Sequence, residues 1–207
     1  MKKLLRSITC ALLVATLFGC SGPKPQETVK SALDDYKNQK VSELDNYFTD
    51  GLPKLDNSTN DSSNKDSSMS LDDLKDQKDI VDKFFDINYS IEEESIEKDT
   101  ATVKVKITSY NIGDKLSEGF SSAMQVALAN AFSEISEEEL QKKTTDAFII
   151  PLKYAEKNME STVDVKLIKK DGKWLIKTNE NTSFINATTG GLWEFGEKMS
   201  QLTTSNQ

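Results

Sequence analysis

The sequence predicts an α+β fold in which N-terminal helices pack on an antiparallel sheet of four strands or more. Apolar residues recur at helical spacing from Val29 to Tyr36, whereas from Ile87 onward they alternate with polar residues, as in half-buried strands. The pair Asp171-Gly172 lies between two alternating runs and favours the type I′ turn of a β-hairpin. Strands joined by such short turns, with the helices separate from them, indicate the α+β class.

Residues 1–19 are typical of a secretion signal peptide. Three basic residues precede an uncharged run that extends from Ile8 to Phe18, which gives the basic and the apolar region of such a signal. The run is too short to cross a membrane, because a transmembrane helix needs about 20 apolar residues. We therefore expect residues 1–19 to be absent from the mature protein.

The end of this segment, Leu17-Phe18-Gly19-Cys20, resembles the lipobox of bacterial lipoproteins. In that family the cysteine is joined to diacylglycerol and becomes the N-terminus once the signal is cut off. The resemblance implies a lipidated tether at residues 20–25, attached to the extracytoplasmic face of the cell membrane through Cys20. The alternative is an ordinary signal peptide with a chance cysteine nearby.

The composition after processing excludes several classes of function. Without residues 1–19 the chain has 23 lysines, 34 acidic residues and therefore a net charge of −11, with no arginine, no histidine and no cysteine except Cys20. An acidic chain without arginine is unsuited to nucleic acid. Without histidine there is neither an imidazole metal ligand nor a Ser-His-Asp triad, and we expect no cofactor. Lysine almost without arginine, together with the lipobox, suggests a Gram-positive bacterium of low GC content.

The mature chain suits one domain of ordinary size, since 188 of the 207 residues remain after the signal. We place this domain at residues 26–200 and expect a disordered tail at 201–207.

Two helical segments are expected at the start of this domain. Pro25 is well placed to begin the first, because proline favours the first turn of a helix. Its apolar side is formed by Val29, Ala32, Leu33 and Tyr36. A shorter helical turn follows, and its apolar residues are Val41, Leu44, Tyr47 and Phe48. Gly51 and Pro53 end this turn.

Residues 56–68 include no apolar residue, so we expect a flexible loop at 56–69. Its Asp and Asn side chains leave a cation site as the alternative, although the spacing lacks the glycine and the terminal glutamate of an EF-hand. Ser70 and Asp73 then form a capping pattern for a helix that ends near Asp86. Its apolar stripe comprises Leu71, Leu74, Ile80, Val81, Phe84 and Phe85.

A first β-hairpin is expected around residues 98–99. Apolar residues alternate on both sides of this turn, at Ile87, Tyr89, Ile91, Ala101, Val103, Val105 and Ile107. A two-residue turn pairs Ile96 with Ala101, but the same register brings Ile91 opposite a lysine. The mismatch predicts a β-bulge within residues 92–95.

The second hairpin turns at Asp171-Gly172. Its register pairs Lys169 with Trp174, Leu167 with Ile176, and Val165 with Thr178. One face then collects the apolar side chains of Val163, Val165, Leu167, Trp174 and Ile176. We expect this face to be buried and the opposite face, which carries the lysines, to be solvated.

Residues 114–158 are expected to form a helical insertion between the two hairpins. Its first helix has an apolar band made of Leu116, Phe120, Ala123, Met124, Ala127, Leu128, Ala131 and Phe132. Ser136 and Glu139 cap the second helix, which Pro151 is expected to kink or restart. We expect the pair to pack together and against the sheet; contact with a partner or a membrane surface is the alternative. Residues 192–199 are expected to dock on the body.

The order of helices, strand meander and closing KKDGKWLI hairpin resembles the cystatin-like or nuclear-transport-factor-like cone fold. In particular, the chain resembles lipoproteins of Gram-positive bacteria that carry such a domain of unknown function. The resemblance covers residues 26–186 and rests on the opening helix that ends in SELDNYF and on Trp174 just after the last turn. The helical pair at 114–158 departs from the minimal fold, and we expect it to fill or cover the concave face.

Three functions are compatible with these patterns. We prefer a membrane-anchored, non-catalytic domain that binds an envelope protein, a peptide or a small ligand. The second is a cone-fold enzyme that uses a buried carboxylate as general base, with Tyr89, Tyr110 or Tyr154 as donor. The third is a transporter-associated solute-binding lipoprotein, for which 188 residues are few to build two lobes.

Overall fold

The computed structural model describes residues 23–53 and 77–204 of the chain. The predictions of a signal peptide at 1–19, of lipidation at Cys20 and of a flexible loop at 56–69 therefore lie outside the described residues.

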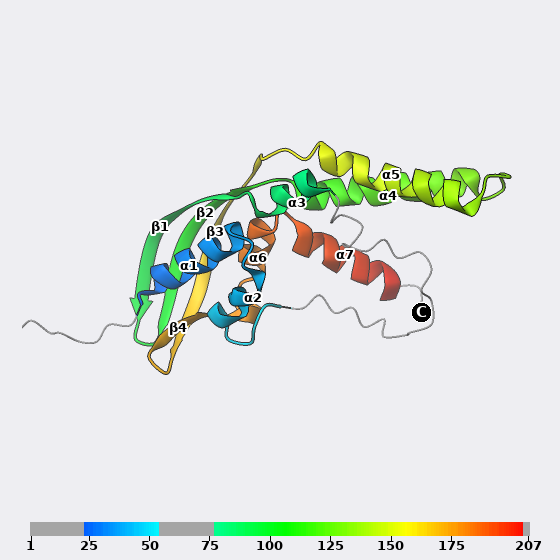
Figure 1. The fold of residues 1–207 in the computed structure, drawn as a ribbon. Helices are drawn as coiled ribbons and strands as arrows, with labels where there is room; N and C mark the ends of the chain where they lie inside the picture. The colour runs from blue at the N-terminus through cyan, green and yellow to red at the C-terminus, as the bar shows by residue number, and fades with distance from the viewer. Residues whose placement is uncertain (1–22, 54–76, 205–207) are drawn as a thin grey trace, which may run out of the picture.

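The described residues form an α+β fold, as predicted, around an antiparallel sheet of four strands (Figure 1). The strands are β1 (Asn88–Glu97), β2 (Thr100–Ser109), β3 (Met159–Lys170) and β4 (Lys173–Ile176). Their order in the sheet is β1-β2-β3-β4, so that each strand pairs with its neighbour in sequence. The sheet is a simple meander, and both predicted hairpins are part of it.

The first hairpin has the predicted bulge. Ile96 lies opposite Ala101 and Ile91 lies opposite Val105, while the register shifts between Ile91 and Glu93. The unpaired residue is Glu92, at the first position of the predicted interval. Because the bulge absorbs one residue, the apolar side chains on both sides of it face the same side of the sheet.

The second hairpin also has the predicted turn. Asp171 and Gly172 both have positive φ angles, 50° and 78°, as a type I′ turn requires. The pairs Lys169–Trp174 and Leu167–Ile176 are present. The expected pair of Val165 with Thr178 is wrong, because β4 ends at Ile176 and the chain enters the short 3₁₀ helix η3 (Thr178–Glu180).

Asn181 explains why β4 can end so early. Its side-chain amide donates to the carbonyl of Lys166 at 2.9 Å and accepts from the amide of Lys166 at 2.8 Å. The amide of Lys177 still donates to the carbonyl of Lys166 at 3.0 Å, as in a β ladder, whereas the amide of Lys166 bonds to the Asn181 side chain in place of a β4 carbonyl. The edge of β3 is therefore satisfied at this point.

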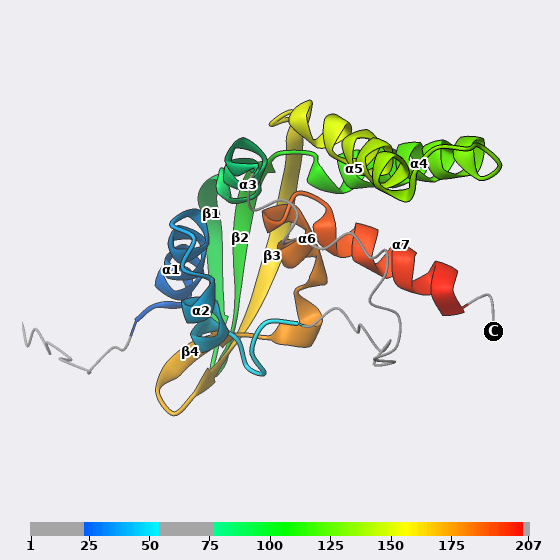
Figure 2. The ribbon, with the colours of Figure 1, turned by 45° about the vertical axis from the view of Figure 1, so that its right-hand side comes forward.

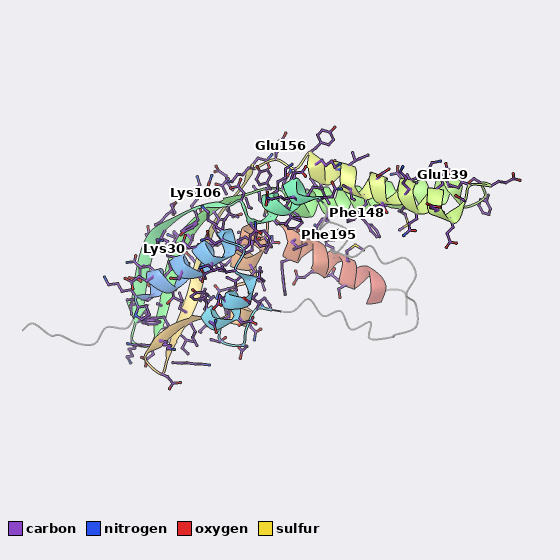
Figure 3. The ribbon with its side chains drawn as sticks, in the orientation of Figure 1. Lys30, Lys106, Glu139, Phe148, Glu156 and Phe195 are labelled. Atoms are coloured by element: carbon purple, nitrogen blue, oxygen red, sulfur yellow. The ribbon has the colours of Figure 1, made fainter. Side chains whose placement is uncertain are left out.

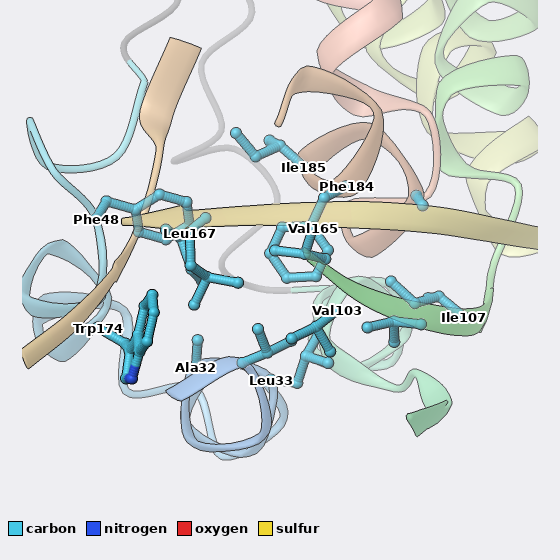
Figure 4. Close-up of a cluster of buried hydrophobic side chains, with 14 of the residues drawn as sticks. Ala32, Leu33, Phe48, Val103, Ile107, Val165, Leu167, Trp174, Phe184 and Ile185 are labelled. Atoms are coloured by element: carbon cyan, nitrogen blue, oxygen red, sulfur yellow. The ribbon is translucent and has the colours of Figure 1, made fainter. Parts of the chain in front are cut away.

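Two helices cover one face of the sheet. α1 (Pro25–Lys37) begins at Pro25 as predicted, and α6 (Thr182–Thr188) follows η3. Side chains from both helices and from the strands make the main core, including Leu33, Val103, Val165, Leu167 and Phe184 (Figure 4). Burying an apolar side chain of this size contributes about 1.5–3 kcal/mol, so this core is what holds the helices on the sheet.

The helical insertion forms an arm instead of covering the sheet. α4 (Ile112–Asn130) and α5 (Glu137–Lys153) pack along each other and project beyond the end of the sheet (Figures 1 and 2). A second apolar core lies at the base of the arm. It joins residues of α4 and α5 to Ile80 of the preceding helix, and α7 (Leu192–Thr204) also packs against it. The expectation that the insertion fills or covers the concave face is wrong, because α1 and α6 already occupy a face of the sheet.

Three boundaries differ from the predictions. α3 spans Lys78–Phe85, and the backbone of Gln77 is not helical. A continuous helix from Ser70 to Asp86 is therefore wrong at Gln77, while the part predicted for residues 70–76 lies outside the described residues. The five residues from 75 to 79 are polar, so the sequence gives no apolar stripe that would carry a helix through this point. α5 continues through Pro151 to Lys153 without restarting. The proline costs the helix only the bond that its own amide would make to the carbonyl of Ala147, and the helix ends two residues later.

The third correction concerns the C-terminus, where α7 extends to Thr204. The first four residues of the predicted tail at 201–207 are therefore helical. The prediction rested on their position at the terminus, although in the sequence Leu202 continues the helical spacing of Leu192, Phe195 and Met199. Elsewhere the expected short turn appears as α2 (Val41–Leu44) and the 3₁₀ helix η1 (Asp45–Tyr47).

Candidate ligand pocket

An apolar pocket of about 490 Å³ lies beside the main core. Its walls come from α1, from α2 and the residues that follow η1, from α3, and from the end of α6 with the start of α7. The lining side chains are Ala32, Leu33, Tyr36, Val41, Leu44, Phe48, Leu52, Val81, Phe84, Phe85, Phe184, Ile185, Thr188, Thr189 and Leu192. The volume falls within the range of sites that bind small molecules, about 300–1,000 Å³.

The helical periodicity of the sequence builds these walls. In α1, Ala32 and Leu33 lie one turn before Tyr36 and therefore on the same side of the helix. In α6, Phe184 and Ile185 lie one turn before Thr188 and Thr189. Ala32, Leu33, Phe184 and Ile185 thus belong both to the main core and to the wall of the pocket, and the residues one turn later extend that wall.

The polar side chains in the lining already have hydrogen-bond partners. The hydroxyl of Tyr36 donates to the carbonyl of Phe84 at 2.7 Å. The hydroxyls of Thr188 and Thr189 each donate to a carbonyl one turn earlier in α6, both at 2.8 Å. None of the described lining side chains is charged. The lining therefore offers hydrocarbon contact and little polar recognition.

Tyr36 also stays neutral. Burial raises the pKa of its hydroxyl above its usual range, because desolvation disfavours the phenolate. Its ring packs against Phe85, with centroids 5.2 Å apart. The tyrosine therefore joins α1 to α3 across the pocket as a neutral hydrogen-bond donor.

The three candidate tyrosines of the sequence lie in different surroundings, and none lines the pocket. Tyr89 donates to Asp34 at 2.5 Å. Tyr110 is half-buried against the second core, and the Lys83 ammonium lies 5.6 Å from its ring centroid. Tyr154 is 72% exposed. Only Tyr89 is thus brought to a carboxylate.

The carboxylate beside Tyr89 is held in its charged form. Hydrogen bonds from Lys30 and Tyr89 lower the pKa of Asp34, since both donors favour the anion. A second such pair joins Tyr47 to Asp35 at 2.6 Å, and this hydrogen bond lowers the pKa of Asp35 and raises that of Tyr47 to about 12. Both pairs fasten α1 to neighbouring elements.

Replacing Tyr89 by phenylalanine should lower the free energy of unfolding by about 1 kcal/mol at pH 7. The full value of a charged hydrogen bond does not apply, because the Asp34 side chain is 40% exposed. The folded-state pKa of Asp34 is below its unfolded value, so this stabilisation is present above about pH 4 and lost as the pH falls through the folded pKa. Urea unfolding from pH 7 down to about pH 2 would show the difference shrink. A constant difference would mean that the phenylalanine disturbs ring packing instead.

Sequence reasoning did not find this pocket. It did not predict α6, which supplies Phe184, Ile185 and both threonines. A signal is present, because Phe184, Ile185 and Thr188 have helical spacing directly after Asn181. The segment is only one to two turns long, however, and such spacing is common by chance.

Two further observations limit the chemistry of the described part of the chain. None of its helices has the length and apolar character needed to cross a membrane. Among the same residues, no group of three or more Asp, Glu, His or Cys side chains is placed to hold a metal ion.

Comparison with known proteins places the chain in no family. No family model matches the sequence, and no curated protein matches it. Among solved structures, the chain is similar to a "putative lipoprotein (ycdA)" of Bacillus subtilis, with 21% identity and a TM-score of 0.36. The match covers 81% of this chain and 48% of the other, so the chain spans about half the length of that protein.

A TM-score of 0.36 does not establish a shared fold, and the cone fold expected from the sequence is not confirmed. The structure thus supports the α+β class, while attachment to a membrane stays a prediction from residues 1–20.

Proposed function

We propose that this chain is a lipid-anchored, non-catalytic binding protein of the outer face of the cell membrane, and that its pocket takes a hydrocarbon chain. The observation that carries this proposal is the lining of the pocket. Its polar side chains are already hydrogen-bonded within the protein, and none of the described lining residues is charged. A sugar, peptide or nucleotide would lose its hydration there without gaining partners, which is costly. A hydrocarbon chain loses no hydrogen bond.

The proposed anchor would hold the pocket close to a source of such chains. Only five residues lead from Cys20 to Pro25, where α1 begins. Fully extended, they span about 17 Å. A domain on so short a tether stays beside the membrane surface.

Lipid attachment is tested by metabolic labelling with a lipid precursor in a Gram-positive host. We expect Cys20→Ala to lose the label, because the thiol is the attachment point. Cys10→Ala is the matched control, since Cys10 lies within the signal, and it should be labelled like the natural chain. Equal labelling of both variants would refute the anchor.

Ligand binding is tested on residues 20–207 carrying Cys20→Ala, so that no attached lipid competes. A fluorescent fatty-acid analogue should bind in a saturable way, and carboxylic acids of increasing chain length should displace it. Each added CH₂ contributes about 0.8 kcal/mol, or about fourfold in affinity, until the pocket is full. We expect the gain to stop at a defined length. A gain that continues with length would indicate adsorption to the surface, and absence of binding would refute the proposal.

The two other functions have less support. A general base needs a carboxyl group whose pKa is raised towards neutrality, whereas every described carboxylate with a shifted pKa is shifted downwards: Asp34, Asp35, Glu93, Glu180 and Glu194. A solute-binding subunit needs two lobes around a cleft, whereas the strands of the described residues belong to a single sheet.

A further inference from the structure

We propose that two copies of the chain associate through their arms, by antiparallel pairing of an exposed apolar stripe on α4. The stripe consists of Met124, Leu128 and Phe132, which are 48%, 67% and fully exposed. Successive members are four residues apart, so they lie on one side of the helix. Phe132 lies in the turn just after α4, but Ala131 before it still has helical dihedral angles, which extends this spacing to the last member.

The stripe lies in the part of α4 that is furthest from the rest of the protein. Near the base of the arm, Leu116 and Ala123 are buried, and Gly119 allows close approach to the backbone of α5 at Phe148. Phe148 and Phe195, labelled in Figure 3, lie where the arm meets α7. Beyond this junction the stripe has no described element to cover it, although exposed apolar side chains that form a row usually mark an interface.

Charge restricts contact between two copies of this chain to the segment that carries the stripe. The whole sequence has 34 acidic and 26 basic residues, so two copies repel each other over most of their surface. Residues 119–133, however, contain no charged residue, while Glu118 and Glu134 lie directly outside them. A contact confined to this uncharged segment brings two acidic proteins together with the least repulsion.

The spacing of the stripe also suits a two-fold axis. With the axis through Leu128, the two leucines meet each other, and Met124 of each copy meets Phe132 of the other. Such a contact is self-complementary, as a symmetric dimer requires, and methionine packs well against an aromatic ring.

The antiparallel direction follows from the acidic end of the arm. Glu134, Glu137, Glu138 and Glu139 gather at the distal end, where Figure 3 labels Glu139. Parallel arms would place these groups side by side. In the antiparallel arrangement, Glu134 instead comes opposite the uncharged Ser122.

A membrane is a less suitable partner for the stripe. The backbone amide of Gln26 donates to Glu94, so α1 begins near the hairpin end of β1 and β2. The arm leaves β2 at the opposite end, after Ser109 (Figure 1). If Cys20 carries the anchor, as proposed above, the distal end of the arm points away from that membrane. Its glutamates would also be repelled by anionic lipid.

Three side chains per copy bury less than the about 800 Å² per partner of a standard interface, so we expect a weak dimer. Sedimentation velocity on residues 20–207 with Cys20→Ala should show a mass that rises with concentration. Leu128→Ser should weaken dimerisation at least tenfold. Because Leu128 is exposed, the melting temperature of this variant should match that of the unsubstituted chain. Ile150→Ser is the matched control, because Ile150 is an equally apolar residue of α5, 51% exposed, and it should leave the dimer intact.

Cross-linking tests the direction of pairing, because this background contains no other cysteine. A short bis-maleimide should link Leu128→Cys to itself, and should link Met124→Cys to Phe132→Cys in a mixed sample. Phe132→Cys alone and Lys142→Cys, on exposed α5, should link poorly. Efficient self-linking of Phe132→Cys would refute the antiparallel arrangement. A monomer at every concentration, or binding to anionic vesicles that Leu128→Ser abolishes, would refute the proposal. Neither outcome depends on ligand binding by the pocket.

Discussion

Alanine in place of Gly190 should lower the free energy of unfolding by about 3 kcal/mol or more. Gly190 has a φ of +63°, and an added Cβ would lie 2.1 Å from the carbonyl oxygen of Tyr110. Its own carbonyl accepts a hydrogen bond from the amide of Gly113 at 2.8 Å. This contact joins the end of α6 to the start of α4, so relieving the clash requires the arm and the body to move apart.

Gly172→Ala is the matched control for this prediction. Gly172 also has a positive φ, +78°, but no atom lies within 4 Å of the added Cβ. Gly172→Ala should therefore lower the free energy of unfolding only by the cost of a left-handed backbone, about 1–2 kcal/mol. Urea unfolding of both variants measures the difference. Equal losses would contradict the close approach of Gly190 to Tyr110.

Substitutions at Val81 should weaken binding of a fatty-acid probe at least tenfold. Val81 lines the pocket from α3 and is only half-buried, so the fold should tolerate a change there. Val81→Asp places a carboxylate against the hydrocarbon, which costs free energy unless the charge stays hydrated. Val81→Trp acts differently, because it fills space that the ligand would occupy. Fluorescence titration with the same probe gives both dissociation constants.

Lys78→Glu is the control for a change of charge on the same helix. Lys78 is exposed and does not line the pocket. Lys78→Glu gives up the ion pair with Asp82, but both side chains are exposed and such pairs contribute little, while an acidic residue at the first turn suits the helix dipole. The Lys78→Glu variant should therefore bind the probe with the affinity of the unsubstituted chain. Loss of binding in this control, or normal binding in both Val81 variants, would place the ligand elsewhere.

Sequence periodicity predicted the hairpin turn, the bulge and the first helix well, because neighbouring residues determine each of them. The Asp171-Gly172 turn sets its own backbone angles, and the parity of apolar residues around Ile91 required a bulge. The first helix follows from Pro25 and from apolar spacing. Each of these features depends on residues that are close in the chain.

The arm and the pocket depend on residues that are distant in sequence. The band on α4 has the composition of a core helix, but part of it stays exposed because α1 and α6 cover the sheet. The pocket combines Leu33, Val81 and Ile185, which only the tertiary fold brings together. Asn181 likewise ends β4 through hydrogen bonds to the backbone of Lys166, and no local sequence pattern predicts these bonds.

The most direct test of hydrocarbon binding in the pocket is a nuclear Overhauser measurement on methyl-labelled residues 20–207 with Cys20→Ala, in the presence of dodecanoic acid. We expect cross-peaks from the ligand methylenes to the methyl groups of Leu33, Leu44 and Ile185, which line the pocket. Cross-peaks from these methyl groups to Leu71 or Leu74 of the chain itself, with none to the ligand, would contradict the proposed function.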